Sequence, residues 1–132
     1  MNLRTVTLGL ASAVTTFLLV GAILLEVLGG LYGESPGVGI LGVSVGFAAG
    51  LGAGVVVAAT ADRLSGVTAA ALIAYGAFGV AFLAVAGLRY VNVPGADEVF
   101  TLPVHLAVSL VVALVAAALA ERTQAADGTT SA

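Results

Sequence analysis

The run VGILGVSVGFAAGLGAGVVVAATA, residues 38–61, decides the fold class because 24 consecutive positions carry no charged side chain. A helix needs roughly 20 apolar residues to cross about 30 Å of hydrocarbon, and this run is long enough. Its apolar residues are continuous rather than alternating, which favours a helix over a strand of a membrane barrel. The run therefore predicts a transmembrane helix.

Three further runs have the same character, at residues 5–31, 66–88 and 100–120. The first is too long for the apolar core of a cleaved signal peptide, roughly 7–15 residues, so we expect it to stay in the protein. We predict an all-α integral membrane four-helix bundle, a single domain over residues 1–121. Residues 122–132 are polar and small, and we expect them to form a short disordered tail.

The composition excludes several classes of protein. The 132 residues are 61% hydrophobic and 8% charged, with too few polar side chains to cover the surface of a soluble domain. Four arginines and no lysine argue against a nucleic-acid partner. One histidine and no cysteine argue against a metal or haem site, and we expect no cofactor. The bias to Ala, Val and Gly suggests a prokaryotic source.

The arginines predict the orientation of the chain in the cell membrane. Arg4, Arg63 and Arg122 fall on one side of the four runs, and Arg89 alone falls on the other. Because positive residues are retained on the cytoplasmic side, both termini should be cytoplasmic.

The most specific motif is a row of glycines in the second helix, the glycine ridge, formed by Gly42, Gly46, Gly50 and Gly54. Residues four apart lie on nearly one face of a helix, so the ridge lets another helix backbone approach closely. We expect either an intramolecular neighbour, for which the last helix provides a row of small residues at Ser109, Ala113 and Ala117, or an interface with another subunit.

Polar residues within the apolar runs are few. Counted from the nearest inner arginine at about 1.5 Å per residue, Glu26, Arg89 and His105 lie roughly 33, 39 and 26 Å away, toward the outer side. An unpaired carboxylate below the interface is costly, so we predict that Glu26 lies within reach of Arg89 or His105. Near mid-membrane, Tyr75 should seek a partner, because its phenol cannot bond to its own backbone.

The segment GAILLEVLGG, residues 21–30, is similar to the first-helix motif of small multidrug resistance transporters, which are also four-helix proteins. That resemblance implies an essential glutamate for proton and cation exchange, at Glu26 here. The chain departs from that family in its longer loops, in the later position of the glutamate and in having no tryptophan.

The sequence also contains the trace of a duplication. Val6, Thr7 and Phe17 recur at the same spacing as Val67, Thr68 and Phe78, and the second and fourth helices end in Asp62-Arg63 and Glu121-Arg122. Two hairpins in parallel orientation would suit some transporters. A chance match within a narrow composition is the alternative.

No catalytic motif or pair of carboxylates occurs, so we expect no enzyme. Our first hypothesis is an accessory or interaction subunit that packs through the glycine ridge, with the bilayer and a second copy or another membrane subunit as partners. The alternative is a small, oligomeric, proton-coupled transporter that uses Glu26.

Overall fold

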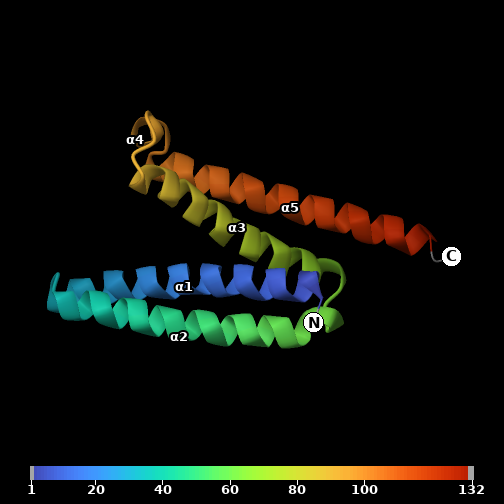
Figure 1. Cartoon of the computed structure of the whole chain (residues 1–132), viewed down its shortest axis with the longest axis horizontal. Helices are drawn as coiled ribbons and strands as arrows, with labels where there is room; N and C mark the ends of the chain where they lie inside the picture. Colours follow the sequence, from blue (N-terminus) through green and yellow to red (C-terminus); the bar gives the residue numbers. More distant parts are fainter. Residues whose placement is uncertain (1, 131–132) are drawn as a thin grey trace. The chain divides into compact units, whose positions relative to one another are not determined.

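The computed structural model describes residues 2–130, which form helices and contain no strand. The elements in chain order are α1 (Leu3–Tyr32), α2 (Pro36–Thr60), the 3₁₀ turn η1 (Ala61–Arg63), α3 (Gly66–Tyr90), α4 (Ala96–Val99) and α5 (Leu102–Thr130). Figure 1 shows the four long helices and the short α4. The all-α class with four long helices is confirmed.

The chain divides into two compact units, Met1–Asp62 and Arg63–Ala132. The first unit is the hairpin of α1 and α2, and the second is the hairpin of α3 and α5 with α4 in its connection. The single four-helix domain expected over residues 1–121 therefore stays a prediction.

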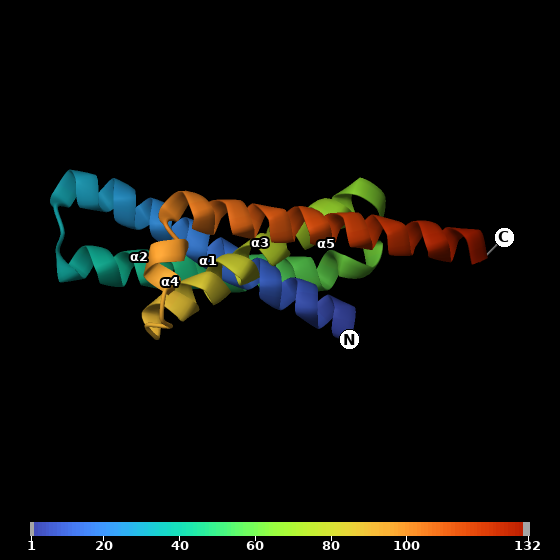
Figure 2. The same ribbon diagram turned by 90° about the horizontal axis from the view of Figure 1, so that it is seen from above.

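Local chemistry fixes the ends of the first hairpin. Asn2 caps α1 by accepting a hydrogen bond from the Thr5 backbone N–H at 2.8 Å. At the other end Gly33 has a φ of +76°, which stops α1, and its N–H bonds to the Gly29 carbonyl at 2.9 Å. Pro36 then begins α2, at a position where proline costs no helical hydrogen bond. In Figure 2 α1 and α2 cross, and their ends diverge toward residues 33–35.

The second hairpin is closed in a different way. Residues 91–101 form its connection, and α4 is a single turn within it that the sequence did not predict. Gly95 begins α4 with a φ of +81°, a conformation that favours glycine. At the opposite end the Gln124 side chain accepts a hydrogen bond from the Gly66 N–H at 3.1 Å. This contact joins the start of α3 to α5.

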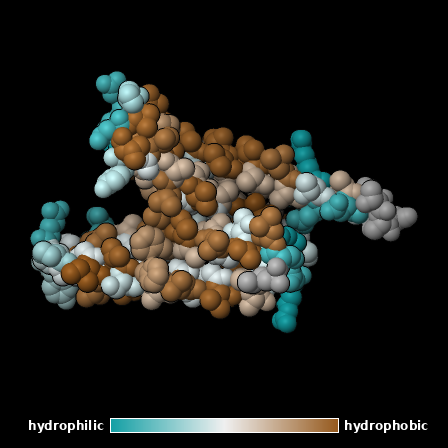
Figure 3. Space-filling model, in the orientation of Figure 1, coloured by the Kyte–Doolittle hydropathy of each residue, from teal (hydrophilic) through white to brown (hydrophobic). Residues whose placement is uncertain are grey.

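All four long helices are long and apolar enough to cross a membrane. The apolar side chains cover the middle of the helices, and hydrophilic residues gather toward their ends (Figure 3). The predicted ranges agree with the helices to within two residues at most ends. The exception is the C-terminal end of α5.

The expected disordered tail at 122–132 is corrected by the structure, because α5 continues to Thr130. Residues 121–126, ERTQAA, are mostly good helix formers. They extend an existing helix, so they carry no cost of nucleation. Residues 131–132 lie outside the described part of the chain.

Candidate functional site

The glycine ridge lies against α1. A Cβ added to Gly50 would meet the Ala13 carbonyl oxygen at 2.6 Å, and one added to Gly46 would meet the Phe17 carbonyl oxygen at 3.0 Å. At Gly54 the Ala13 Cβ would lie 2.9 Å away. A side chain at Gly46, Gly50 or Gly54 would therefore require α1 and α2 to separate. The backbones of α1 and α2 therefore approach closely, which favours dispersion contacts between them.

The neighbour of the ridge is α1, whereas the sequence offered the last helix as its intramolecular neighbour. The small row of the last helix lies on the side of α5 that faces α3, where Ser109 and Ala113 are buried. The ridge instead meets small residues of α1, among them Gly9 and Gly21. These residues also recur at four-residue spacing with Ala13 and Phe17, so the complementary row was visible in the sequence.

A second row of small residues lies on the opposite face of α2. Ser44, Ala48 and Gly52 follow one another at the same spacing of four, and each lies about 200° around the helix from the ridge glycine two residues before it. We call these three residues the outer row. All three are exposed, and a Cβ added to Gly52 would meet no atom within 4 Å. Sequence reasoning missed the outer row because the glycine ridge dominates the same stretch.

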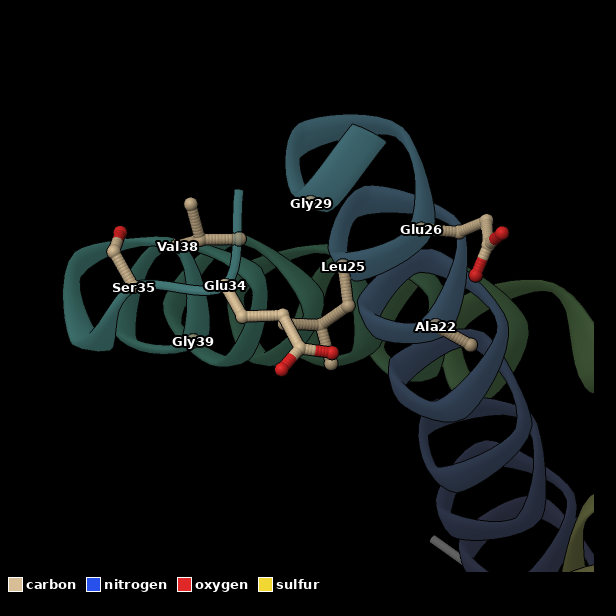
Figure 4. Close-up of a pocket in the computed structure, with 8 residues that line it drawn as sticks. All are labelled: Ala22, Leu25, Glu26, Gly29, Glu34, Ser35, Val38 and Gly39. Atoms are coloured by element: carbon tan, nitrogen blue, oxygen red, sulfur yellow. The ribbon is translucent and has the colours of Figure 1, made fainter. Parts of the chain in front are cut away.

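The diverging ends of α1 and α2 border an open pocket at the loop end of the first hairpin, with a volume of about 590 Å³. Its polar lining residues are Glu26 of α1 together with Glu34 and Ser35 of the connection. In Figure 4 the Glu34 side chain extends toward Leu25, whereas the Glu26 carboxylate points away from α2. The two carboxylates thus border one pocket without converging on a common point.

Arg89 is paired within its own hairpin. Its Nε lies 3.0 Å from the Asp97 carboxylate, which follows in α4. The two side chains are 40% and 64% exposed, so this ion pair contributes little to stability, about 0.2–1 kcal/mol. Its effect is to hold the connection against the end of α3.

His105 is buried between α5 and α3, with 3% of its surface exposed. Its Nε2 lies 2.8 Å from the Phe82 carbonyl oxygen, so this nitrogen carries the proton and donates the hydrogen bond. The imidazole also stacks on the Phe82 ring, with centroids 4.0 Å apart. His105 thus acts as a packing residue that joins the two helices of the second hairpin.

The predicted cluster of Glu26, Arg89 and His105 spans both units. His105 faces Phe82, seven residues and about 10 Å along α3 from Arg89, so these two do not lie at one level. Glu26 belongs to the first unit, and its contact with either residue stays a prediction. Tyr75 lies half-buried in the middle of α3, where the sequence placed it.

Several hydroxyls of the apolar helices bond to their own backbones, as is usual in membrane helices, whereas the buried Ser12 hydroxyl has no hydrogen-bond partner within residues 2–130. Thr15 donates to the Ala11 carbonyl at 2.9 Å, and Ser109 donates to the His105 carbonyl at 2.9 Å. In residues 2–130 no group of three or more His, Asp or Glu side chains could hold a metal ion. The polar chemistry of the described helices is thus largely used in local bonds.

A polar cluster at the opposite end of the first hairpin was not predicted. The Thr5 hydroxyl lies 3.4 Å from the Asp62 carboxylate, and the Asn2 amide nitrogen lies 3.5 Å from the same oxygen. Thr5 is buried and bonds to Asn2 as well. The cluster ties the start of α1 to the end of α2. The sequence signal for this cluster was Asn2, which stands just before the first apolar run and is a residue type that caps helices.

Four membrane-length helices define the class of this chain: an α-helical multi-pass membrane protein. More specifically, the chain belongs to a family of unknown function, whose model, described as "Domain of unknown function (DUF8147)", matches residues 2–120. The match covers both hairpins and ends before the polar extension of α5. No curated protein and no solved structure matches the chain.

Proposed function

We propose that this protein is a non-catalytic membrane subunit that binds a transmembrane helix of another membrane protein through the outer row of α2. The glycine ridge is filled by α1, so the ridge holds the hairpin together and cannot also receive a partner. The observation that carries the proposal is the second small row, Ser44, Ala48 and Gly52, exposed on the opposite face.

Small residues on two opposite faces suit a helix that lies between two others. In a bilayer, lipid tails are as apolar as leucine, so association gains most where small residues let backbones approach closely. Leucine and valine on that face would serve equally well to contact lipid. The outer row therefore supports close contact with a helix, and the local use of the hydroxyls supports a structural role over a chemical one.

Native purification tests this proposal. A tagged chain is purified from its own membranes in a mild detergent, and the accompanying subunits are identified by mass spectrometry. We expect a stoichiometric membrane protein to accompany the chain, and Ala48→Leu to remove it. Ala107→Leu is the matched control, because Ala107 is exposed on α5 and gains the same bulk.

Size measurement in the same detergent decides between two kinds of partner. A homo-oligomer that Ala48→Leu dissociates would identify the partner as a second copy. A monomer without companions, unaffected by either substitution, would overturn the proposal.

The second candidate is a proton-coupled transporter, which is favoured by the pocket that Glu26 lines. A carboxylate beside a pocket of this size at one end of a hairpin can bind a proton or a cation. In proteoliposomes with a pH gradient, Glu26→Gln should abolish proton-coupled uptake of a cationic dye and leave stability unchanged. Glu34→Gln, in the same pocket, is the control. Equal uptake by the unaltered chain and by both variants would exclude this candidate.

We further propose that the protein lies in the cell membrane with both termini in the cytoplasm. The excess of Arg4, Arg63 and Arg122 over Arg89 supports this orientation. The pocket at the loop end of the first hairpin would then open at the outer surface of the membrane.

A further inference from the structure

The two hairpins can be compared residue by residue through the similarities in the sequence. An offset of 61 aligns α1 with α3 and matches Val6, Thr7, Ala13 and Phe17 with identical residues. An offset of 59 aligns α2 with α5. Over residues 45–63 it gives 8 identities in 19 positions, and one of these is Arg63 with Arg122, in a chain with only four arginines.

These offsets come from the sequence alone, and the packing provides an independent check. In the first hairpin, a Cβ on Gly46 would lie 3.1 Å from the Gly21 Cα. By these offsets, Phe82 is the equivalent of Gly21, and His105 is the equivalent of Gly46. In the second hairpin Phe82 and His105 are in contact, through a hydrogen bond of 2.8 Å and stacked rings. The equivalent residues thus face each other in both hairpins.

A shift of one helical turn in either alignment would break this agreement. Two antiparallel helices could pack in many registers and with any of their faces. Here the same faces meet in the same register, although the loops between the helices differ in length, with 3 residues from 33 to 35 and 11 from 91 to 101.

We propose that residues 3–63 and 64–122 are two copies of one hairpin, which pack through the same faces in the same register. Because each copy crosses the membrane twice, both have the same orientation, the arrangement of parallel repeats. Ridge residues Gly46, Gly50 and Gly54 are then equivalent to His105, Ser109 and Ala113, and each set faces its own hairpin partner.

The copies differ in how closely their helices approach. The first has glycine at ridge positions 46, 50 and 54, and the second has His105, Ser109 and Ala113 at the equivalent positions. Side chains must then fill the space between α3 and α5, and the stacked His105 and Phe82 rings do so. In the first copy α1 and α2 meet closely through their backbones, and in the second α3 and α5 meet through side chains.

The repeat predicts a contact that can be tested. Ala13 and Gly54 are in contact in the first hairpin, and the offsets carry them onto Ala74 and Ala113. A disulfide requires Cβ atoms roughly 3.5–4.5 Å apart, so cross-linking reports register to within a turn. The chain has no cysteine, so each double variant contains one pair of thiols only.

The experiment oxidises two double variants in native membranes and counts free thiols with a maleimide of high mass. We expect Ala74→Cys with Ala113→Cys to close. Ala74→Cys with Ala117→Cys, one turn away, should stay open. Closure of this shifted pair in preference to Ala74 with Ala113 would refute the repeat. Failure of Ala74→Cys with Ala113→Cys to close would also refute it, since this is the contact that the repeat predicts.

Discussion

Gly50→Ala is the smallest change that tests the contact between α1 and α2. The added methyl group would lie 2.6 Å from the Ala13 carbonyl oxygen, a backbone atom that cannot move without its helix. Ordinary contacts of a Cβ begin at roughly 3.4 Å. The two helices must therefore separate by most of an ångström at this point, and neighbouring contacts along the ridge are weakened too.

Overpacking of this kind costs about 1–3 kcal/mol. Replacing glycine by alanine within a helix also gains up to about 1 kcal/mol of helix propensity, which would partly hide the cost. Gly52→Ala removes this ambiguity, because Gly52 lies in the same helix and its added Cβ would meet no atom within 4 Å. The propensity gain is common to both variants, so the difference between them is the packing cost when the chain is purified free of any partner bound at the outer row.

Heating the detergent-solubilised variants and measuring the surviving monomer by size-exclusion chromatography gives the apparent Tm. We expect Gly50→Ala to melt several degrees below Gly52→Ala, since 1 kcal/mol corresponds to roughly 2–8 °C in small domains. Gly50→Leu should lower the apparent Tm further, and Leu51→Gly should lower it only slightly. Equal melting of the two alanine variants would refute close packing of α1 on the ridge.

Three further predictions concern the rest of the chain. His105→Phe keeps the ring stacked on Phe82 but loses the hydrogen bond to its carbonyl, so it should cost about 0.5–1.5 kcal/mol in the same melting assay. Asp97→Asn should change stability by less than about 1 kcal/mol, because its ion pair with Arg89 is exposed, and a larger loss would indicate a further contact. A reporter fused at residue 130 should lie in the cytoplasm, and a reporter inserted within residues 91–95 should lie outside. An exported C-terminus would reverse the proposed orientation.

The fold class could be predicted from the sequence because it depends on the length and continuity of apolar runs. A helix that crosses lipid must satisfy its own backbone, so four such runs allow few alternatives. The ends of helices were predictable where a residue imposes them, as Gly33 and Pro36 do. The extension of α5 was not predicted, because residues 122–132 are polar and small, although residues 122–130 continue an existing helix.

The contacts were harder to predict, because they depend on which faces of the helices meet. The glycine ridge was evident, but two helices carried matching small rows, and sequence alone could not choose between them. His105 lies near the loop end of its hairpin, as expected from its position early in α5, but its hydrogen bond to the Phe82 carbonyl and its stacking on the Phe82 ring could not be predicted from the sequence. The Arg89–Asp97 pair depends on α4, a turn too short to be predicted.

The most direct test of the central proposal is site-specific photo-cross-linking from α2 in native membranes. A photoreactive residue at Leu41 lies on the face of the outer row, and one at Phe47 lies about 120° away around the helix; both positions are exposed. We predict a cross-link to one defined membrane protein chain from Leu41 and adducts with lipid alone from Phe47. Lipid adducts alone from both positions would contradict the proposal that the outer row of α2 binds a partner helix.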